Sequence, residues 1–523
     1  MHYTDVIQLG GHKLGIEKQL DKSFRFHYLP LGEPEEVVTA EETLLSNDNL
    51  KLKYRSSIFI LGLDSYVFLM PNLIKKLPSN RIIYSQNENL TVDLVELLQK
   101  KCAEPIKFEE AHTIINEIFF GGQYGLRLDF EKIDISPLLK NQIEQFGRGE
   151  INIKDVNLVS QVQAISWRMT ISLNANSLFE FWPEYELKGK GKVIFKLYII
   201  DAVSYIPIKT YEIFNKKTPE PFLFKTGENR TILYVAAFLQ GSIEKFSIRE
   251  IHIRKSRAKH GNFMVNSSMI ADRKHCNGQL AVYFDSGDFK PPLNVYFSGW
   301  RTAEGFEGAG IMNQVGGGGV PHLLIADERL KGGAFYIGSR EFEAEVVSTI
   351  SKYLKYLGFS KDQLVLSGIS MGTTAALYYS SMLSPKAVIV GKPLVNLGTI
   401  AANERIDRPY GFPTSLDLLL LNEKTTSYDA QQHFNERFWS TFRKGKFKNT
   451  MFAIAYMKQD DYDSTAFDEL FKFLKNKYPY SKITYKGLVG RHNDNTVGIV
   501  NWFMRQFENI MEEGFDRRSS NIE

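Results

Sequence analysis

The chain has 523 residues, of which 43% are hydrophobic and 24% are charged. These values are ordinary for a globular protein, and the length suggests about two to four domains. The formal net charge of +4 gives no argument for a nucleic-acid partner.

The cysteines and the apolar runs indicate the cellular compartment of the protein. The two cysteines, Cys102 and Cys276, are far apart in the sequence, which favours a reducing environment over a disulfide framework. The first residues show no basic segment followed by an apolar one, as a secretory signal would. The best apolar run, residues 66–70, is too short to cross a bilayer. We expect a cytoplasmic protein, at most peripheral to a membrane.

Residues 1–129 alternate short apolar runs with helical patterns, which predicts a small α/β domain. Gly10 and Gly11 follow the first run, and a tight turn explains them better than a phosphate-binding loop, because the rest of a dinucleotide motif is missing. The expected strands are 5–9, 57–61, 66–70 and 81–84, and the expected helices are 91–100 and 109–119.

Residues 130–260 show short strand-like runs separated by turn signals, which predicts an antiparallel β-sandwich, jelly-roll-like in form. The expected strands are 164–173, 193–201, 231–239 and 246–253. Such domains often bind carbohydrate through exposed aromatic side chains, although core positions are the more common fate of aromatic residues. The candidates are Trp167, Phe181, Trp182 and Tyr185. The basic run 252–260 is interpreted as a solvated strand end and linker, with an anionic partner surface as the alternative.

Residues 261–523 return to alternating strands and helices, which predicts a mostly parallel sheet covered on both faces. The segment 391–443 breaks the alternation and is rich in proline and aromatic residues, so we expect it to form a cap over an active site. The expected strands are 281–284, 293–298, 322–326, 363–366, 387–390, 451–456 and 483–485. The expected helices are 342–356, 372–382, 467–476 and 495–511.

The motif Gly368-x-Ser370-x-Gly372 lies between the strand at 364–366 and the helix that begins near Met371. A strand that turns sharply into a helix exposes the central hydroxyl above the sheet edge, and the glycines keep side chains out of the crowded turn. Ser370 is therefore the predicted nucleophile. The N–H of Met371 is a predicted oxyanion donor.

A serine nucleophile needs a base and an acid, which in the α/β-hydrolase order follow it in sequence. Two histidines come after Ser370, and His492 is preferred to His433 because it lies in the loop between the last strand and the last helix. Asp460 is the first carboxylate after the strand at 451–456. The nearby acids, Asp461 and Asp463, remain open as alternatives.

The second oxyanion donor is expected in the loop after the strand at 293–298, from the N–H of Gly299 or Trp300. The glycine run 316–319 precedes a strand and is interpreted as a flexible connection. No pattern of metal ligands or cofactor-binding residues is visible in the sequence.

The runs at 366–373, 456–465 and 490–495, together with the length and domain order, resemble the second accessory secretory protein of the accessory Sec system of Gram-positive bacteria. The resemblance implies a triad of Ser370, Asp460 and His492, although the acid of that family can also be glutamate. It implies O-acetylation of N-acetylglucosamine on a serine-rich repeat adhesin. It also implies two other accessory secretory proteins and a SecA-type motor as partners in export of that glycoprotein.

Two alternatives compete with this interpretation. A carboxylesterase or lipase would use the same acyl-enzyme but pass the acyl group to water. A non-catalytic scaffold of the export complex would explain why about half of the chain, residues 1–260, is not needed for the chemistry.

Overall fold

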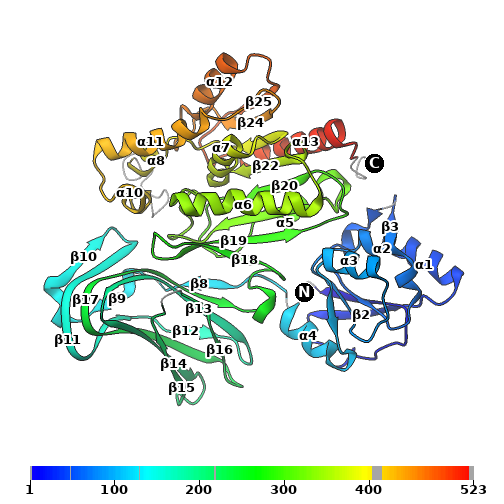
Figure 1. Ribbon diagram of the computed structural model, residues 1–523, viewed down its shortest axis with the longest axis horizontal. Helices are drawn as coiled ribbons and strands as arrows, with labels where there is room; N and C mark the ends of the chain where they lie inside the picture. The colour runs from blue at the N-terminus through cyan, green and yellow to red at the C-terminus, as the bar shows by residue number, and fades with distance from the viewer. Residues whose placement is uncertain are drawn as a thin grey trace.

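The chain folds around three large sheets that follow one another in sequence (Figure 1). The computed structural model describes residues 3–47, 49–119, 121–128, 130–216, 219–402 and 415–517. Within these residues, no helix combines the length and the apolar character needed to cross a membrane.

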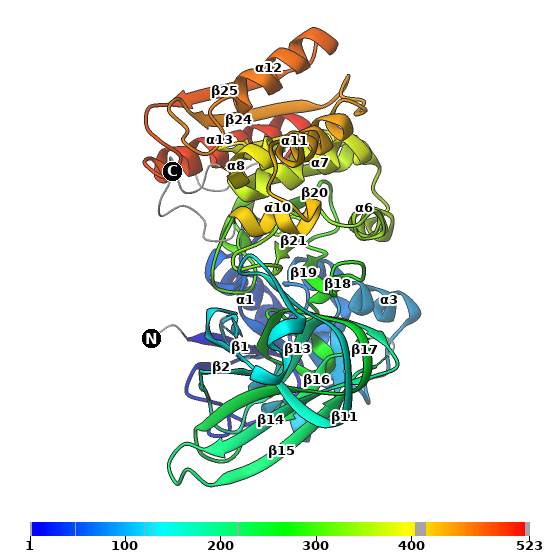
Figure 2. The same cartoon turned by 90° about the vertical axis from the view of Figure 1, so that its left-hand side faces the viewer.

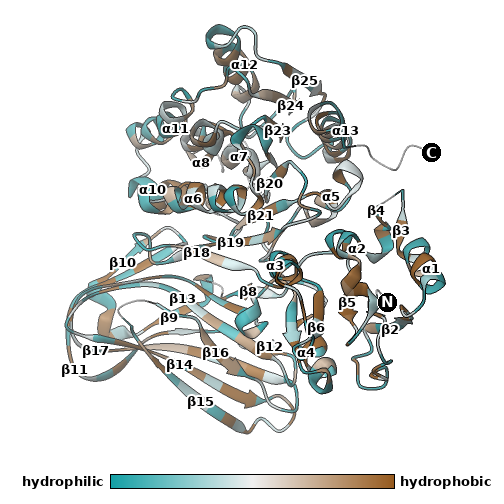
Figure 3. Cartoon of the chain, turned by 45° about the vertical axis from the view of Figure 1, so that its right-hand side comes forward, coloured by the Kyte–Doolittle hydropathy of each residue, from teal (hydrophilic) through white to brown (hydrophobic). Residues whose placement is uncertain are grey.

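The first sheet has five parallel strands in the order β2-β1-β5-β6-β7. Figure 3 shows β5 and β6 as strongly hydrophobic strands between helices. Residues 66–70, predicted as a strand, instead contain a 3-10 helix, Tyr66–Leu69, at the surface, where Leu69 is 70% exposed. Gly10 and Gly11 form a left-handed turn with φ of 64° and 65°. The strands are β1 (Thr4–Leu9), β2 (Phe24–Leu29), β5 (Ile58–Leu61), β6 (Ile82–Ser85) and β7 (Glu104–Ile106), and the helices are α1 (Pro34–Leu44), α2 (Pro71–Lys76), α3 (Val92–Lys100) and α4 (Ala111–Ile118).

The second sheet has ten antiparallel strands joined by hydrogen bonds into one sheet, where the sequence predicted a sandwich of two sheets. The runs predicted at 231–239 and 246–253 belong to one 25-residue strand, β17 (Thr231–Lys255). Beside Gly241, the register against β11 (Glu150–Trp167) shifts between Leu158 and Val162, and such a bulge bends the strands. Figures 1 and 2 show this curvature, with the β14–β15 hairpin at the end remote from the third sheet. The other strands are β8 (Gly125–Arg127), β9 (Ile133–Ile135), β10 (Ile143–Phe146), β12 (Ile171–Leu173), β13 (Leu178–Gly189), β14 (Lys192–Asp201), β15 (Pro207–Phe214) and β16 (Phe222–Lys225).

The aromatic residues named as candidates for sugar binding are all buried, which is the more common outcome that the sequence analysis gave for such residues. Trp167, Phe181 and Tyr185 pack in the core of the second sheet. Trp182 lies on the other face of the strand and donates a hydrogen bond from Nε1 to the Asn277 carbonyl at 3.2 Å. These side chains provide apolar packing and an anchor to the third part of the chain.

The basic run 252–260 was predicted to be solvated, and this is wrong for three of its basic residues, His252, Arg254 and Arg257, which are buried. Glu304 accepts hydrogen bonds from His252 Nδ1 at 2.6 Å and from Arg254 Nε at 2.7 Å. Opposite charges on the two sides of the contact make this burial tolerable. The end of β17 therefore forms an ionic contact that joins the second sheet to the loop after β20.

The third sheet has eight strands in the order β18-β19-β21-β20-β22-β23-β24-β25. β19 is antiparallel to both neighbours, and all other pairs beyond it are parallel. The strands are β18 (Ser268–Asp272), β19 (Gly278–Asp285), β20 (Leu293–Phe297), β21 (His322–Asp327), β22 (Leu364–Ile369), β23 (Ala387–Gly391), β24 (Met451–Met457) and β25 (Ile483–Leu488).

Helices cover both faces of this sheet. One face packs on α6 (Arg340–Leu357), α7 (Met371–Leu383) and α12 (Ala466–Lys477), and the other on α5 (Ala309–Met312) and α13 (Thr496–Phe515). Of the predicted cap, 391–443, residues 403–414 lie outside the described residues. The remainder forms α8 (Leu397–Ala402), α10 (Ser415–Glu423) and α11 (Tyr428–Phe442), which share the α7-side hydrophobic core.

Candidate active site

Ser370 lies at a sharp turn between β22 and α7, as the sequence predicts. Its backbone has φ 55° and ψ −122°, a strained conformation for a residue with a side chain. A Cβ atom at Gly368 would lie 2.5 Å from the Gly372 carbonyl, and one at Gly372 would lie 2.0 Å from the Phe297 carbonyl oxygen. Only glycine fits at either position, so the two flanking residues permit the turn that presents the serine.

Ser370, His492 and Asp460 form a continuous chain of hydrogen bonds. Ser370 Oγ lies 2.8 Å from His492 Nε2, and His492 Nδ1 lies 2.8 Å from Asp460 Oδ2. The imidazole is 1% exposed and Asp460 is 7% exposed. Asp460 accepts a hydrogen bond from the Nδ1–H group of His492. Nε2 therefore carries no proton and is the hydrogen-bond acceptor that faces the serine hydroxyl.

The structure distinguishes among the three neighbouring carboxylates. Asp460 alone contacts the imidazole ring, and its other oxygen accepts the Tyr462 N–H at 2.8 Å. Asp461 accepts the backbone N–H of His492 at 3.0 Å. Asp463 accepts the N–H of Val395 at 2.7 Å, and burial raises its pKa to about 6. The two alternative acids therefore hold loops in place rather than the ring.

Two residues that the sequence analysis missed affect His492, one by stacking and one by its charge. The Tyr462 ring stacks on the imidazole with centroids 4.3 Å apart and an angle of 8° between the planes. Lys392 lies on the sheet edge after β23 and is 4% exposed. Burial lowers the pKa of His492, the Asp460 carboxylate raises it, and the Lys392 charge lowers it, with a net result below its ordinary value. No motif in the sequence signals either neighbour.

The predicted oxyanion donors differ in whether their N–H groups are available to a substrate. Met371 begins α7 directly after Ser370, so its N–H lies at the helix N-terminus beside the hydroxyl. The N–H of Gly299 is already donated to Glu307 Oε2 at 2.8 Å, which contradicts its assignment as a donor to substrate in this arrangement. The loop still adjoins the serine turn, since a Cβ at Gly299 would lie 3.3 Å from the Ile369 carbonyl oxygen. Met371 and Trp300 remain the candidate donors.

A cavity of about 1060 Å³ lies on the acid side of this group, between α11, α12 and the loop after β24. Asp460 and Tyr462 line it together with amide, hydroxyl and aromatic side chains. These include Asn396, Thr399, Gln432, Asn435, Trp439, Ser464, Thr465 and Phe473. Charged side chains, Glu436, Arg443, Glu469 and Lys472, line it as well. Such a surface suits a polar molecule better than an apolar chain.

His433, the histidine that was not preferred, is on the surface. Its side chain is 74% exposed and Nδ1 lies 2.8 Å from Glu423 Oε2. Over the part of the chain that the structure describes, no group of three or more His, Cys, Asp or Glu residues is arranged to hold a metal ion.

Comparison with known proteins gives matches along almost the whole chain. The family described as the accessory Sec system GspB-transporter matches residues 4–517. An accessory Sec system protein of Staphylococcus aureus is 33% identical over 98% of this chain and 97% of its own length. One of Streptococcus gordonii is 34% identical over 90% of this chain and 91% of its own length. A chain of the Glycosylation Associate Protein complex from Streptococcus agalactiae is 30% identical, with a TM-score of 0.83 over 99% of this chain and 100% of that one.

Proposed function

The chain belongs to the accessory Sec system GspB-transporter family, and from this premise we propose that it is an acyltransferase in that export system. We propose that Ser370, His492 and Asp460 transfer an acetyl group to N-acetylglucosamine on a serine-rich repeat glycoprotein. The observation that carries the proposal is the hydrogen-bonded chain from Ser370 Oγ through His492 to Asp460, at 2.8 Å for each contact.

The strand order supports the same chemistry. Numbered along the chain, the eight strands of the third sheet run 1-2-4-3-5-6-7-8 with the second antiparallel, the arrangement of α/β-hydrolases. Ser370 follows the fifth strand, Asp460 the seventh and His492 the eighth, which is the chain order of a nucleophile, acid and base on that fold.

In the first half-reaction, His492 Nε2 accepts the proton of Ser370 as Oγ attacks the carbonyl carbon of an acyl donor. The negative charge on the carbonyl oxygen develops beside the Met371 N–H. Asp460 stabilises the imidazolium and keeps its proton on Nδ1. Collapse of the intermediate expels the leaving group, which takes the proton from Nε2, and leaves Ser370 acylated.

In the second half-reaction, a hydroxyl group gives its proton to His492 Nε2 and attacks the acyl-serine, and the proton then returns to Ser370 Oγ. A sugar hydroxyl makes the protein a transferase, and water makes it an esterase. The cavity beside Asp460 supports the transferase, because its polar side chains can hydrogen-bond the hydroxyl groups of a sugar acceptor.

The test measures both products from one purified protein. With p-nitrophenyl acetate as donor and a peptide that carries N-acetylglucosamine as acceptor, we expect acetylated glycopeptide by mass spectrometry, at a rate that depends on acceptor concentration. Acetate as the sole product would favour the esterase. No product above that of the Ser370→Ala variant would contradict both.

A second function has its own support. The first two sheets lie outside the proposed catalytic part, and the similar chain from Streptococcus agalactiae belongs to a complex. We propose that this protein also assembles with two other accessory secretory proteins and serves export through a SecA-type motor, on the cytoplasmic side of the membrane. Export of the adhesin by a strain that carries Ser370→Ala separates the two roles: normal export without glycan acetylation is expected, and lost export would tie assembly to the chemistry.

A further inference from the structure

Lys392 is a buried lysine beside the proposed triad that the reaction above does not use. It is 4% exposed and has a left-handed backbone, with φ of 61°. Among the described residues, its ammonium has one hydrogen bond, from Nζ to Thr496 Oγ1 at 3.4 Å, and no carboxylate in ion-pair contact. Removing an ammonium from water without a direct counter-ion is costly, so its position requires an explanation.

Three backbone elements fix Lys392 among the proposed catalytic residues. The residue before it, Gly391, accepts the Ser370 N–H at 2.8 Å. Its own N–H is donated to the carbonyl of Ala455, on the strand that leads to Asp460, at 2.8 Å. Thr496, its side-chain partner, begins the helix that follows the His492 loop. The lysine therefore contacts the elements that carry the nucleophile, the acid and the base.

The charges around the ammonium come from two loops. Burial lowers the pKa of Lys392, whereas the carboxylates of Asp460 and Glu307 raise it. The two carboxylates therefore favour the charged form without reaching direct contact. Asp460 comes from the loop after β24, and Glu307 from the loop after β20.

The groups that face the imidazole have opposing effects on the pKa of His492. Burial and the Lys392 charge lower the pKa of His492, and the carboxylates of Asp460 and Asp461 raise it. Tyr462 covers one face of the ring and Ser370 lies at Nε2. Burial is the largest of these effects, and the Lys392 charge acts in the same direction against the two acids. Both therefore disfavour the protonated imidazole, which cannot accept a proton from the serine.

We propose that Lys392 is a positioning residue: its buried ammonium disfavours the imidazolium and so keeps His492 in the neutral form that accepts the Ser370 proton. The role rests on the proposed acyl transfer. It acts through His492 and requires no contact with the substrate.

The test is a titration of His492 that needs no turnover. In full-length protein labelled with 13C at histidine, the ring signal assigned by its loss in His492→Gln is followed against pH. We expect the midpoint to rise in Lys392→Met, by up to about one pH unit, because a positive charge that disfavours the imidazolium is removed. Lys392→Arg should keep the wild-type midpoint. Lys458→Met, which removes an exposed lysine just after β24, is the matched control and should also leave it unchanged.

The rate profile provides a second readout, because the acidic limb of acyl transfer should move to higher pH by the same amount in Lys392→Met and return in Lys392→Arg. Lys392→Gln replaces the methionine variant if that one does not fold. An unchanged His492 midpoint in the folded, uncharged variant overturns the role of Lys392 whatever the activity. Full activity in Ser370→Ala would instead remove the proposed function and leave the titration readable.

Discussion

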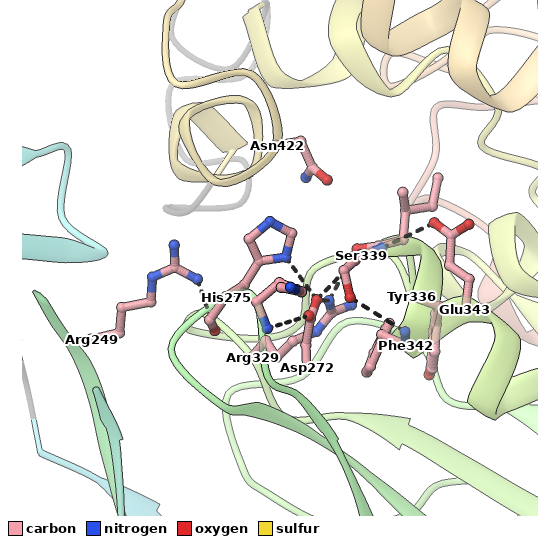
Figure 4. Close-up of polar contacts among 12 residues, drawn as sticks. Arg249, Asp272, His275, Arg329, Tyr336, Ser339, Phe342, Glu343 and Asn422 are labelled. Carbon is pink, nitrogen blue, oxygen red and sulfur yellow. Dashed lines mark hydrogen bonds and ion pairs between the residues drawn. The ribbon is translucent and has the colours of Figure 1, made fainter. Parts of the chain in front are cut away.

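Two groups of serine, histidine and aspartate lie in the C-terminal part of this chain, and they do different things. In the first, His492 lies between Ser370 and Asp460. In the second, shown in Figure 4, Asp272 lies in the middle: Oδ2 is 2.7 Å from His275 Nδ1 and accepts the backbone N–H of Ser339 at 3.0 Å.

The backbone explains the difference. Ser339 has φ −65° and ψ 159°, an ordinary extended conformation, and its Oγ accepts the Phe342 N–H as the N-cap of α6. Ser370 has φ 55° and no side-chain cap bond, so its Oγ is left for the imidazole. The same three residue types therefore stabilise a helix start and a strand end in one place, and form a proton-transfer chain in the other. Residue identity alone does not make a triad; the backbone that presents the hydroxyl does.

The largest expected effect separates the two serines. Ser370→Ala should lower acyl transfer about 10⁴-fold or more, because the nucleophile is lost. The matched Ser339→Ala variant should leave the rate unchanged and lower the free energy of unfolding by about 1 kcal/mol, as for a lost N-cap. Initial rates and denaturant melts of the purified variants measure both. A similar loss of rate in both variants would contradict the distinction.

Removal of the acid should have the next largest effect. Asp460→Asn should lower kcat by up to about 10⁴-fold, because the amide no longer fixes the tautomer that leaves Nε2 as acceptor. Asp461→Asn is the control, since its carboxylate bonds the His492 backbone rather than the ring. Comparable losses in the two variants would mean that the acid is misassigned.

The pH dependence follows from His492. Burial lowers the pKa of this imidazole below its ordinary value, and the neutral form is the competent base. We therefore expect kcat/KM to stay constant as pH falls to about 6.5, the ordinary value for histidine, and to decline only below it. A decline that begins at higher pH would show that the imidazole is not held in its neutral form.

The second group should respond to acid through stability rather than rate. Burial alone would raise the pKa of Asp272, but the His275 hydrogen bond and the Arg329 charge hold it well below the usual range. This stabilisation is present above the unfolded value of about 3.9 and is lost as pH falls toward the folded value. Asp272→Asn should lower the free energy of unfolding at pH 7 by about 2 kcal/mol, because it removes the charged acceptor of the His275 hydrogen bond. It also removes the contact with Arg329 at 3.7 Å, although Arg329 keeps its closer pair with Asp327 at 2.7 Å. Equal melting of the variant and the wild type would contradict this role.

Local patterns predicted much of the third sheet and the proposed triad. The Gly-x-Ser-x-Gly turn, the place of His492 and the first acid after β24 all follow from short-range sequence and chain order. They could be predicted because a parallel sheet brings its carboxyl-terminal loops to one edge. Asp460 could be separated from Asp461 and Asp463 only with coordinates, since the three lie within four residues.

What the sequence could not show depends on contacts between distant segments. Glu307 captures the Gly299 N–H across a loop, and Lys392 reaches the site from a strand far from His492 in sequence. The basic run at 252–260 has the composition of a solvated segment, but Glu304, in the loop after β20, pairs with His252 and Arg254. The 3-10 helix at Tyr66–Leu69 has the composition of a buried strand, but only Val67 is fully buried in it, so apolar content alone gave the wrong prediction.

The most direct test of the account is the nucleophilicity of Ser370. The full-length protein is treated with a fluorophosphonate, digested, and mapped by mass spectrometry. We expect a single modified site at Ser370, lost in His492→Gln and retained in His275→Gln, with Ser339 unmodified throughout. An unmodified Ser370 in the folded wild-type protein, or labelling that does not depend on His492, would contradict it.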